Sequence, residues 1–392
     1  MTNIKFKALK KRRKSREIMV GNIGIGGNNP VRVQTMTNTD TLNVKATVKQ
    51  IIECVQAGSE LIRIATQTPK HVRKIKEIRE ELKNKKINIP IIADIHYLPS
   101  AAFEALKYAD KIRLNPGNFL SKNVFQGIDF NEKNYAKQIA IMEKSLLPFI
   151  KELRKTKIPI RIGSNLGSLS ERIVKMHGNT PDGMVVSTME YLRIFKKYNF
   201  NEIVVALKAS DPLIMIEANR MLVYEMKKEK MDYPIHLGVT EAGNANEGRA
   251  KSIIGIGTLI LEGIGDTIRV SLTEYPAKEI PVCYDILQAT RRRITKTEFI
   301  SCPGCGRTQF DIEKVANKVK KKTEHLKGLR IAVMGCIVNG LGEMGDADFG
   351  YIGGIKGKVN LYFKKKLMKK NVLEKNAVEE LIDLIKQKGK WQ

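Results

Sequence analysis

Eight short runs rich in β-branched residues recur between residues 31 and 273, and each is followed by a segment whose apolar residues have helical spacing. After the first run, for example, Val44, Val48, Ile51 and Val55 lie on one face of a predicted helix. Eight such units are the pattern and length of a TIM (β/α)8 barrel. A doubly wound open sheet is the alternative, but no glycine-rich dinucleotide-binding turn follows the first run. The predicted strands are residues 31–36, 60–65, 90–96, 111–116, 160–165, 203–209, 234–241 and 267–273.

A domain boundary is expected after the eighth strand, where Pro276, Pro281 and three consecutive arginines interrupt the alternation. We therefore expect a substrate-binding barrel over residues 1–289 and a smaller α+β domain over residues 290–392. In the smaller domain, the pattern predicts strands at 298–302, 329–336 and 358–363, a glycine-rich loop after the second strand, and helices at 311–326 and 377–388. Asp311 is the expected N-cap of the first of these helices.

Polar and charged residues gather where the barrel strands are expected to end, which is where active sites of such barrels lie. For any single residue an exposed position is the commoner explanation. Coincidence is a poor explanation for five cations that converge on one end of the barrel beside a single glutamate. Their positive charge suits a phosphorylated ligand, best a diphosphate. The residues at these ends are Arg63, Asp94, His96, Arg113, Asn115, Arg161, Asn165, Lys208, Glu241, Arg269 and Ser271.

Three of the five cysteines have the spacing of a metal or redox site. Cys302 and Cys305 form a C-x2-C pair, and Cys336 follows later in the same domain. Three thiolates leave a four-coordinate site one ligand short, and neither His nor Cys follows Cys336. Glu343 is therefore the candidate for the fourth position, where a weakly held carboxylate would suit catalysis; a solvated loop carboxylate is an equally good interpretation. Cys54 and Cys283 are expected to be buried thiols.

The formal net charge of +28 first suggests a nucleic-acid ligand. The excess is spread along the chain nearly in proportion to length, with local concentrations at residues 1–16 and 355–370. Neither concentration shows the aromatic interleaving of a nucleic-acid site, so no nucleic-acid partner is expected. The sequence shows no secretory signal and no apolar stretch long enough for a membrane helix, which predicts a cytoplasmic protein without a membrane partner.

Several longer motifs point to one family. They are RRKSR at 12–16, VQTMTNT at 33–39, ADIH at 93–96, RLNPGN at 113–118, HLGVTEAG at 236–243, GDTIRVSLT at 265–273, SCPGCGRT at 301–308 and GCIVNG at 335–340. With these motifs the chain resembles the 4-hydroxy-3-methylbut-2-enyl diphosphate synthases over nearly its whole length. Only 28 residues separate Thr273 from Cys302, so the additional domain of plant-type members is missing. Leu341 stands where the family usually has proline.

The resemblance implies an oxidoreductase of isoprenoid precursor biosynthesis, in the methylerythritol phosphate pathway. Its reaction would be the reductive ring opening and dehydration of 2-C-methyl-D-erythritol 2,4-cyclodiphosphate. By the same resemblance, a 4Fe–4S cluster would be held by Cys302, Cys305, Cys336 and Glu343. The substrate would be bound by Arg63, Arg113, Asn115, Arg161, Lys208, Arg269 and Ser271. Glu241 would donate a proton or position the substrate, assisted by His96 and Asn165, and Glu343 would take part in catalysis as the exchangeable ligand.

The implied partners are an acidic electron donor, such as ferredoxin or flavodoxin, and a second copy of the chain in a homodimer. Lysines of the segment 355–370 are hypothesised to attract that donor, with a plain solvated lysine surface as the alternative. Two other functions stay open at this point. One is an iron–sulfur or zinc protein that binds RNA through its lysines, and the other is a cluster-free barrel enzyme that acts on a different diphosphate.

Overall fold

The computed structural model describes residues 8–95, 97–120 and 122–391. The chain forms two compact units, Met1–Arg293 and Ile294–Gln392.

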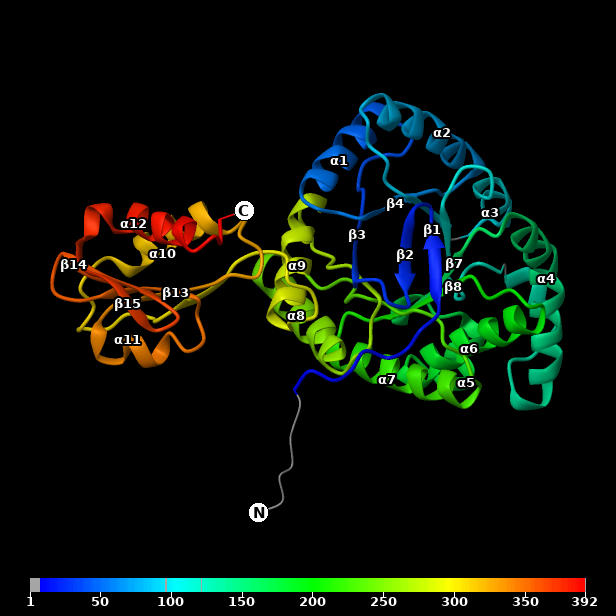
Figure 1. The fold of residues 1–392 in the computed structure, drawn as a ribbon. Helices are drawn as coiled ribbons and strands as arrows, with labels where there is room; N and C mark the ends of the chain where they lie inside the picture. Colours follow the sequence, from blue (N-terminus) through cyan, green and yellow to red (C-terminus); the bar gives the residue numbers. More distant parts are fainter. Residues whose placement is uncertain (1–7, 96, 121, 392) are drawn as a thin grey trace, which may run out of the picture. The chain divides into compact units, whose positions relative to one another are not determined.

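The first unit is a barrel of parallel strands surrounded by helices (Figure 1), which confirms the predicted fold. Its sheet has the strand order β8-β7-β6-β5-β4-β3-β10-β9, and a parallel bridge between Val205 and Ile235 joins the two edges. The strands are β3 (Arg32–Met36), β4 (Leu61–Ala65), β5 (Ile91–Ile95), β6 (Lys111–Leu114), β7 (Ile160–Asn165), β8 (Ile203–Lys208), β9 (His236–Leu237) and β10 (Thr267–Ile268).

The helices of this unit pack their apolar faces on the outside of the strands. In α1, for example, Val48 and Ile51 are buried, and the side chain of the N-cap residue Asn43 accepts a hydrogen bond from the backbone of Ala46. The helices are α1 (Val44–Gln56), α2 (Pro69–Asn84), α3 (Pro99–Ala105), α4 (Tyr135–Thr156), α5 (Glu171–His177), α6 (Pro181–Lys197), α7 (Pro212–Lys228), α8 (Ala245–Leu261) and α9 (Glu279–Ala289).

An antiparallel hairpin closes the end of the barrel at which the strands begin. It consists of β1 (Glu17–Val20) and β2 (Ile23–Gly26). Its apolar residues Ile18, Val20 and Ile25 form one buried cluster with the barrel residues Leu61, Ile92 and Val204. The sequence pattern did not predict this hairpin. Its consequence is that ligands reach the barrel interior from the opposite end, where the strands finish.

The second unit contains a five-stranded mixed sheet with helices on both faces (Figure 1). Helices α10 and α12 cover one face through Val319 and Leu381, and the segment of α11 covers the other through Met344. The strands are β11 (Glu298–Ser301), β12 (Arg330–Met334), β13 (Phe349–Gly353), β14 (Lys358–Phe363) and β15 (Lys366–Leu373). The helices are α10 (Ile312–Thr323), α11 (Ile337–Glu343) and α12 (Glu374–Gln387).

Three details of this unit differ from or refine the sequence prediction. Asp311 caps α10 as expected, because its side chain accepts a hydrogen bond from the backbone of Lys314. The predicted glycine-rich loop after β12 was wrong, because residues 337–343 form α11. Gly340 lets this helix lie close to the sheet: a β-carbon there would come within 2.7 Å of Ile352. Strands β13 and β15 were not predicted.

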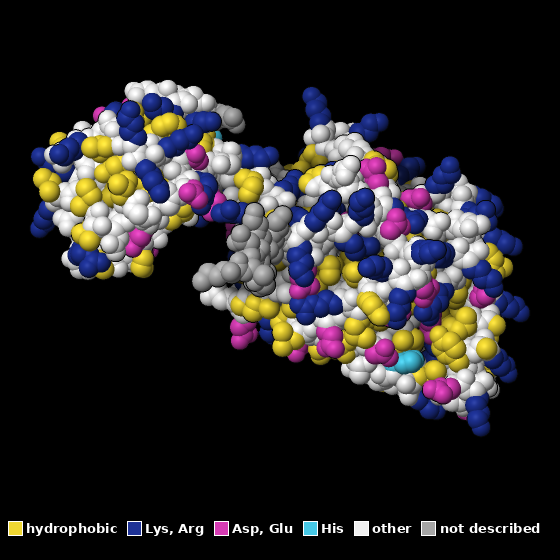
Figure 2. All heavy atoms as spheres, turned by 60° about the horizontal axis from the view of Figure 1, so that its bottom comes forward, with side chains coloured by type: hydrophobic (Ala, Val, Ile, Leu, Met, Phe, Trp, Pro, Cys, Tyr) yellow, Lys and Arg dark blue, Asp and Glu magenta, His cyan; other side chains and the backbone are white. Residues whose placement is uncertain are grey.

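Basic residues are scattered over the visible surface of both units (Figure 2), in keeping with the even charge distribution of the sequence. The described residues of the N-terminal basic segment are engaged within the barrel unit. Arg16 Nε donates to Asp232 at 2.6 Å, Ser15 donates to Asp266 at 2.9 Å, and Arg12 also pairs with Asp266. These arginines anchor the segment. Among the helices that the structure describes, none is long and apolar enough to cross a membrane.

Candidate active site

Five cations lie in the barrel interior, and four of them are in the middle, at the end or just after the end of their strands. Arg161 was also predicted at a strand end, but it is the second residue of β7. Arg63, Arg113, Arg161 and Lys208 belong to β4, β6, β7 and β8, and Arg269 directly follows β10. Strand register places Arg113 opposite Arg161. The charges of all four arginines act on Lys208, so the five cations lie within electrostatic reach of one another. The sequence predicted these five residues as a group, and the structure brings them together.

Two glycines provide the space that these long side chains occupy. A β-carbon at Gly163 would lie 3.1 Å from Arg113 Nε and 3.3 Å from Arg161 Nε. At Gly238 it would lie 2.6 Å from Lys208 Nζ and 2.5 Å from the carbonyl oxygen of Arg269. Because the second contact is with backbone, a larger residue at Gly238 would displace either the strand or the lysine.

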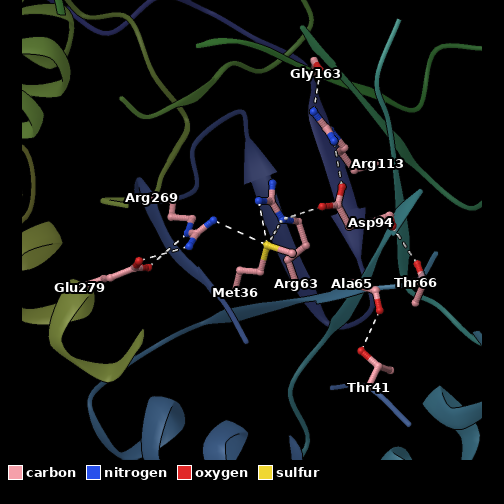
Figure 3. Close-up of polar contacts among 10 residues, drawn as sticks. All are labelled: Met36, Thr41, Arg63, Ala65, Thr66, Asp94, Arg113, Gly163, Arg269 and Glu279. Carbon is pink, nitrogen blue, oxygen red and sulfur yellow. Dashed lines mark hydrogen bonds and ion pairs between the residues drawn. The ribbon is translucent and has the colours of Figure 1, made fainter. Parts of the chain in front are cut away.

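Two buried carboxylates hold three of the arginines in place (Figure 3). Asp94 accepts a hydrogen bond from Arg113 Nη1 at 3.2 Å and lies 3.7 Å from Arg63 Nε. Glu279 accepts two hydrogen bonds from Arg269, each 3.2 Å long. Carboxylate–guanidinium contacts of this kind orient a planar side chain as well as balancing its charge. These arginines are therefore preorganised before any ligand binds.

A methionine sulfur lies between two of the arginines (Figure 3). Met36 Sδ is 3.0 Å from Arg63 Nη2, 3.1 Å from Arg63 Nε and 3.7 Å from Arg269 Nη1. A thioether is a weak, uncharged acceptor. It therefore separates the two guanidinium groups without neutralising either of them.

The remaining cations are buried in surroundings that disfavour their charge. Burial, followed by the nearby arginines, lowers the pKa of Lys208 well below its ordinary value, and burial also lowers the pKa of Arg161. Burial lowers the pKa of Arg63 to about 10. Arg161 Nε and Nη1 have no hydrogen-bond partner among the described residues. An anion bound at this position would raise these pKa values again and accept hydrogen bonds from Arg161 Nε and Nη1.

A sixth cation, Lys111, lies deeper in the barrel. It is two residues before Arg113 on β6, so strand alternation directs both side chains to the interior. Lys111 is 1% exposed, and its Nζ has no hydrogen-bond partner in the described part of the chain. Burial and the charges of Arg161 and Arg63 lower its pKa well below the ordinary value. Lys111 was not among the site residues predicted from the sequence. It is a further basic group beside the five predicted cations.

The other predicted site residues of the barrel have varied surroundings. Asn115 is fully buried and donates from Nδ2 to Ser168 at 2.9 Å, while its Oδ1 accepts from the backbone of Gly117 at 3.2 Å. Asn165 ends β7, and Ser271 is part of the segment after β10; both are partly exposed. Glu241 is exposed in the segment after β9 and has a φ angle of +53°. His96 lies outside the described residues.

The left-handed backbone of Glu241 is unusual for a residue with a side chain. Such conformations cost free energy and cluster at ligand-binding and catalytic positions. Nine other described non-glycine residues also have a positive φ, so the angle marks Glu241 only together with its place just after β9.

The three predicted thiolate ligands lie at one end of the second sheet. Cys302 follows β11, and Cys336 lies between β12 and α11. Cys302 Sγ accepts a hydrogen bond from the backbone of Gly335 at 3.2 Å. The segment with Cys305 is tied to the same place, since Cys305 N donates to Thr308 Oγ1 at 2.9 Å and Gln309 N donates to the carbonyl oxygen of Gly335 at 2.9 Å. These contacts bring all three cysteine-bearing segments next to Gly335.

Glu343 is the last residue of α11 and is exposed. No three His, Cys, Asp or Glu side chains of the described chain are arranged to hold a single metal ion. A cluster of several irons spreads its ligands over different iron atoms, so its cysteines need not converge on one point. Three thiols on adjacent loops, of which Cys302 and Cys336 are partly buried and Cys305 is exposed, fit such a group.

Four residues that shape the site were given no role from the sequence. Asp94 stood among the polar strand ends but received no role, and Lys111, Met36 and Glu279 were not considered. Lys111 had a usable signal, because it alternates with Arg113 on a predicted strand. Glu279 had none, since only the folded chain brings α9 to Arg269.

Comparisons with known proteins agree over almost the entire chain. The GcpE TIM-barrel domain matches residues 15–284, and the GcpE protein C-terminal domain matches residues 298–387. A 4-hydroxy-3-methylbut-2-en-1-yl diphosphate synthase (ferredoxin) of Prochlorococcus marinus is 46% identical, covering 97% of this chain and 94% of that protein. The enzyme of the same name from Synechococcus sp. (strain CC9902) is 47% identical, covering 97% and 95%.

Among solved structures, an N-acetylneuraminic acid synthetase from Leptospira borgpetersenii overlaps with a TM-score of 0.45 and 13% identity, covering 79% of this chain and 98% of that one. That overlap is too low to bear on function. The two domain matches and the relatives identical at nearly half of their positions are decisive: the chain belongs to the GcpE family.

Proposed function

We propose that this protein converts 2-C-methyl-D-erythritol 2,4-cyclodiphosphate into 4-hydroxy-3-methylbut-2-enyl diphosphate, as the names of its relatives suggest. The observation that carries the proposal is the group of five cations inside the barrel, in which two buried carboxylates, Asp94 and Glu279, pair with three of the arginines. The surplus positive charge suits a diphosphate, which is present in both substrate and product.

We assign different roles in substrate binding to two groups of these cations. Arg63, Arg113 and Arg269 are oriented by carboxylates, so they supply directed hydrogen bonds. Arg161 and Lys208 form no ion pair within the described part of the chain, so an anionic ligand would be the group that balances their charge. Ser271 and Asn115 are proposed as further binding residues, with Asn115 also holding the loop at Gly117.

The conversion takes up two electrons and two protons and releases water. The ring opens when a bond between carbon and a diphosphate oxygen breaks, and a hydroxyl group leaves as water. We assign proton donation to the carboxyl group of Glu241, assisted by Asn165 and His96. The exposure of Glu241 and its left-handed backbone support a carboxyl group presented to the ligand.

We infer that Cys302, Cys305 and Cys336 hold a 4Fe–4S cluster, with Glu343 at the fourth iron. When bound, the cluster supplies electrons one at a time and an iron that acts as a Lewis acid. The thiols provide the soft ligands that iron–sulfur clusters require. The Glu343 carboxylate is a harder ligand, so it leaves one position exchangeable.

The electron donor is proposed to be an acidic ferredoxin-type protein, because the relatives carry ferredoxin in their names. We further propose a homodimer in the cytoplasm, where unpaired cysteines stay reduced. Co-expression of a Cys305→Ala chain with a Glu241→Gln chain tests whether the site combines both copies. A site shared between copies predicts partial recovery of activity in verified mixed dimers, whereas a single-chain site predicts none.

Anaerobic purification followed by metal analysis tests the cofactor. The proposal predicts brown protein that contains iron and sulfide, whereas colourless protein with stoichiometric zinc would overturn it. Turnover of the cyclodiphosphate with a strong chemical reductant tests the activity itself. Assigning the linear diphosphate by mass then distinguishes this reaction from action on another diphosphate.

A further inference from the structure

Glu279 contacts three separate segments at the active-site end of the barrel. It is the first residue of α9 and is 2% exposed. Its Oε2 accepts a hydrogen bond from Thr35 Oγ1 in β3 at 2.8 Å, and its Oε1 accepts one from the backbone of Leu272 at 3.1 Å. Both oxygens also accept from Arg269. Glu279 therefore links α9 to β3, to Arg269 and to the segment that contains Ser271.

These contacts determine which edge of the Arg269 guanidinium stays available. Nε and Nη2 are each 3.2 Å from a Glu279 oxygen. Nη1 points instead toward Met36, whose sulfur also contacts Arg63 (Figure 3). Because the guanidinium is planar, two parallel hydrogen bonds along one edge fix the direction of the other edge. The edge that carries Nη1 therefore faces Met36 and, beyond its sulfur, Arg63.

A second contact from α9 holds the backbone beside Arg269. Cys283 lies one turn after Glu279, and its Sγ accepts a hydrogen bond from Val270 N at 3.4 Å. Burial raises the pKa of Cys283 to about 12, so this residue is a packing thiol and not a nucleophile. Helix α9 thus holds the chain at Val270 and at Leu272, on both sides of Ser271.

We propose that Glu279 is a positioning residue, which orients Arg269 and the Ser271 segment for a diphosphate and so favours diphosphate over single phosphate. This inference rests on the proposed function, because it requires Arg269 to bind the diphosphate. A carboxylate beside an anion site also repels the ligand. If charge were its only effect, a neutral substitution would tighten binding of every anion. If Glu279 acts by positioning, its substitution weakens anion binding instead, and the affinity for diphosphate falls most.

Calorimetric titration of the full-length protein with inorganic pyrophosphate and with orthophosphate separates these effects. We expect Glu279→Gln and Glu279→Asp each to weaken pyrophosphate binding about 10-fold, which is the size of effect that loss of one charged hydrogen bond produces. Orthophosphate binding should weaken less. Aspartate keeps the charge but is one methylene shorter, so it cannot restore the geometry. Tighter binding in Glu279→Gln, or wild-type binding in Glu279→Asp, would overturn the inference. Glu279→Asp also serves as the test if Glu279→Gln does not fold.

Glu274→Gln is the matched control. Glu274 pairs with Arg249 through both oxygens, at 2.5 and 2.9 Å, in the segment that precedes α9. It is also a bidentate carboxylate–arginine pair, but it uses Nη1 and Nη2 of Arg249, and Glu274 has no described contact with Arg269. We expect its pyrophosphate affinity to equal that of the wild type, and a loss equal to that of Glu279→Gln would contradict the positioning role.

Arg269→Leu separates failure of this inference from failure of the proposed function. If Arg269→Leu leaves pyrophosphate affinity unchanged, the diphosphate assignment itself fails. If Arg269→Leu weakens binding and Glu279→Gln does not, only the positioning role fails. When both hold, the double variant should lose less affinity than the sum of the two single losses, because Glu279 acts in part through Arg269 and in part through the Ser271 segment. In turnover, Glu279→Gln should raise KM about 10-fold and leave kcat within about 2-fold.

Discussion

Arg113 donates a hydrogen bond from Nη1 to Asp94 Oδ1 at 3.2 Å, and both side chains are almost fully buried, 3% and 5% exposed. Arg113 Nη2 donates to the carbonyl oxygen of Gly163 at 3.0 Å, in the neighbouring strand β7. One arginine thereby connects three adjacent strands, β5, β6 and β7. Its charge is held at the barrel mouth by contacts that exist before a ligand arrives.

Arg113→Leu should therefore raise the KM for the cyclodiphosphate by about 10–100-fold, as the loss of a charged hydrogen bond implies. Steady-state kinetics with the cluster-loaded enzyme measures this effect. Arg73→Leu in α2 is the control, because Arg73 is 64% exposed and pairs with Glu104 on the surface. A normal KM in Arg113→Leu would remove this residue from the diphosphate site.

The barrel could be predicted from sequence because each of its strands is a short β-branched run between helical patterns. Parallel strands buried on both faces leave this strong local signal. The hairpin β1–β2 was missed because each strand has only four residues, and its burial depends on Leu61, Ile92 and Val204 from distant strands. Helix α11 was missed because Gly340 and Gly342 disfavour a helix locally, and packing on the sheet outweighs that preference.

The cations of the site were also predictable, because barrel topology converts strand ends into one shared mouth. Their partners were not. Glu279 reaches Arg269 from a helix, and Met36 lies between two arginines only in the folded chain. Sequence position carries no information on such contacts. Lys111 is the exception, since its place two residues before Arg113 already directed it inward.

Diphosphate binding should be accompanied by proton uptake. Burial and nearby cations lower the pKa of Lys111 and Lys208 in the ligand-free protein, and a bound anion would raise both pKa values again. Binding that takes up protons weakens as the pH rises. Calorimetry with pyrophosphate in buffers of different ionisation enthalpy measures the uptake. Lys111→Met should take up fewer protons than the wild type at the same pH; equal uptake would show that Lys111 does not respond to the ligand.

Glu343→Ala should retain much of the iron but lose most of the turnover. Three thiolates suffice to hold the cluster, whereas the exchangeable position depends on the fourth ligand. Iron content and anaerobic turnover are measured on the same preparation, with Glu313→Ala in α10 as an exposed control. Complete loss of iron, or unchanged turnover, would each contradict the role assigned to Glu343.

The turn between β14 and β15 is the proposed site of attraction for the electron donor. Lys364, Lys365 and Lys366 are exposed there, whereas Lys369 pairs with Glu380. Replacing these three lysines by glutamate should slow ferredoxin-dependent turnover, most strongly at low salt, and leave turnover with a small neutral reductant unchanged. Replacement of Lys318, Lys320 and Lys321, which are exposed on α10, is the matched control. Equal effects of both triple variants would identify an ordinary lysine surface.

Anaerobic turnover of 2-C-methyl-D-erythritol 2,4-cyclodiphosphate by the iron-loaded protein, with a strong chemical reductant, tests the central claim most directly. The account predicts 4-hydroxy-3-methylbut-2-enyl diphosphate as the product, formed with two electrons per molecule, and strongly reduced formation by Glu241→Gln at unchanged iron content. Iron-loaded, folded protein that binds the cyclodiphosphate but forms no linear diphosphate would contradict it.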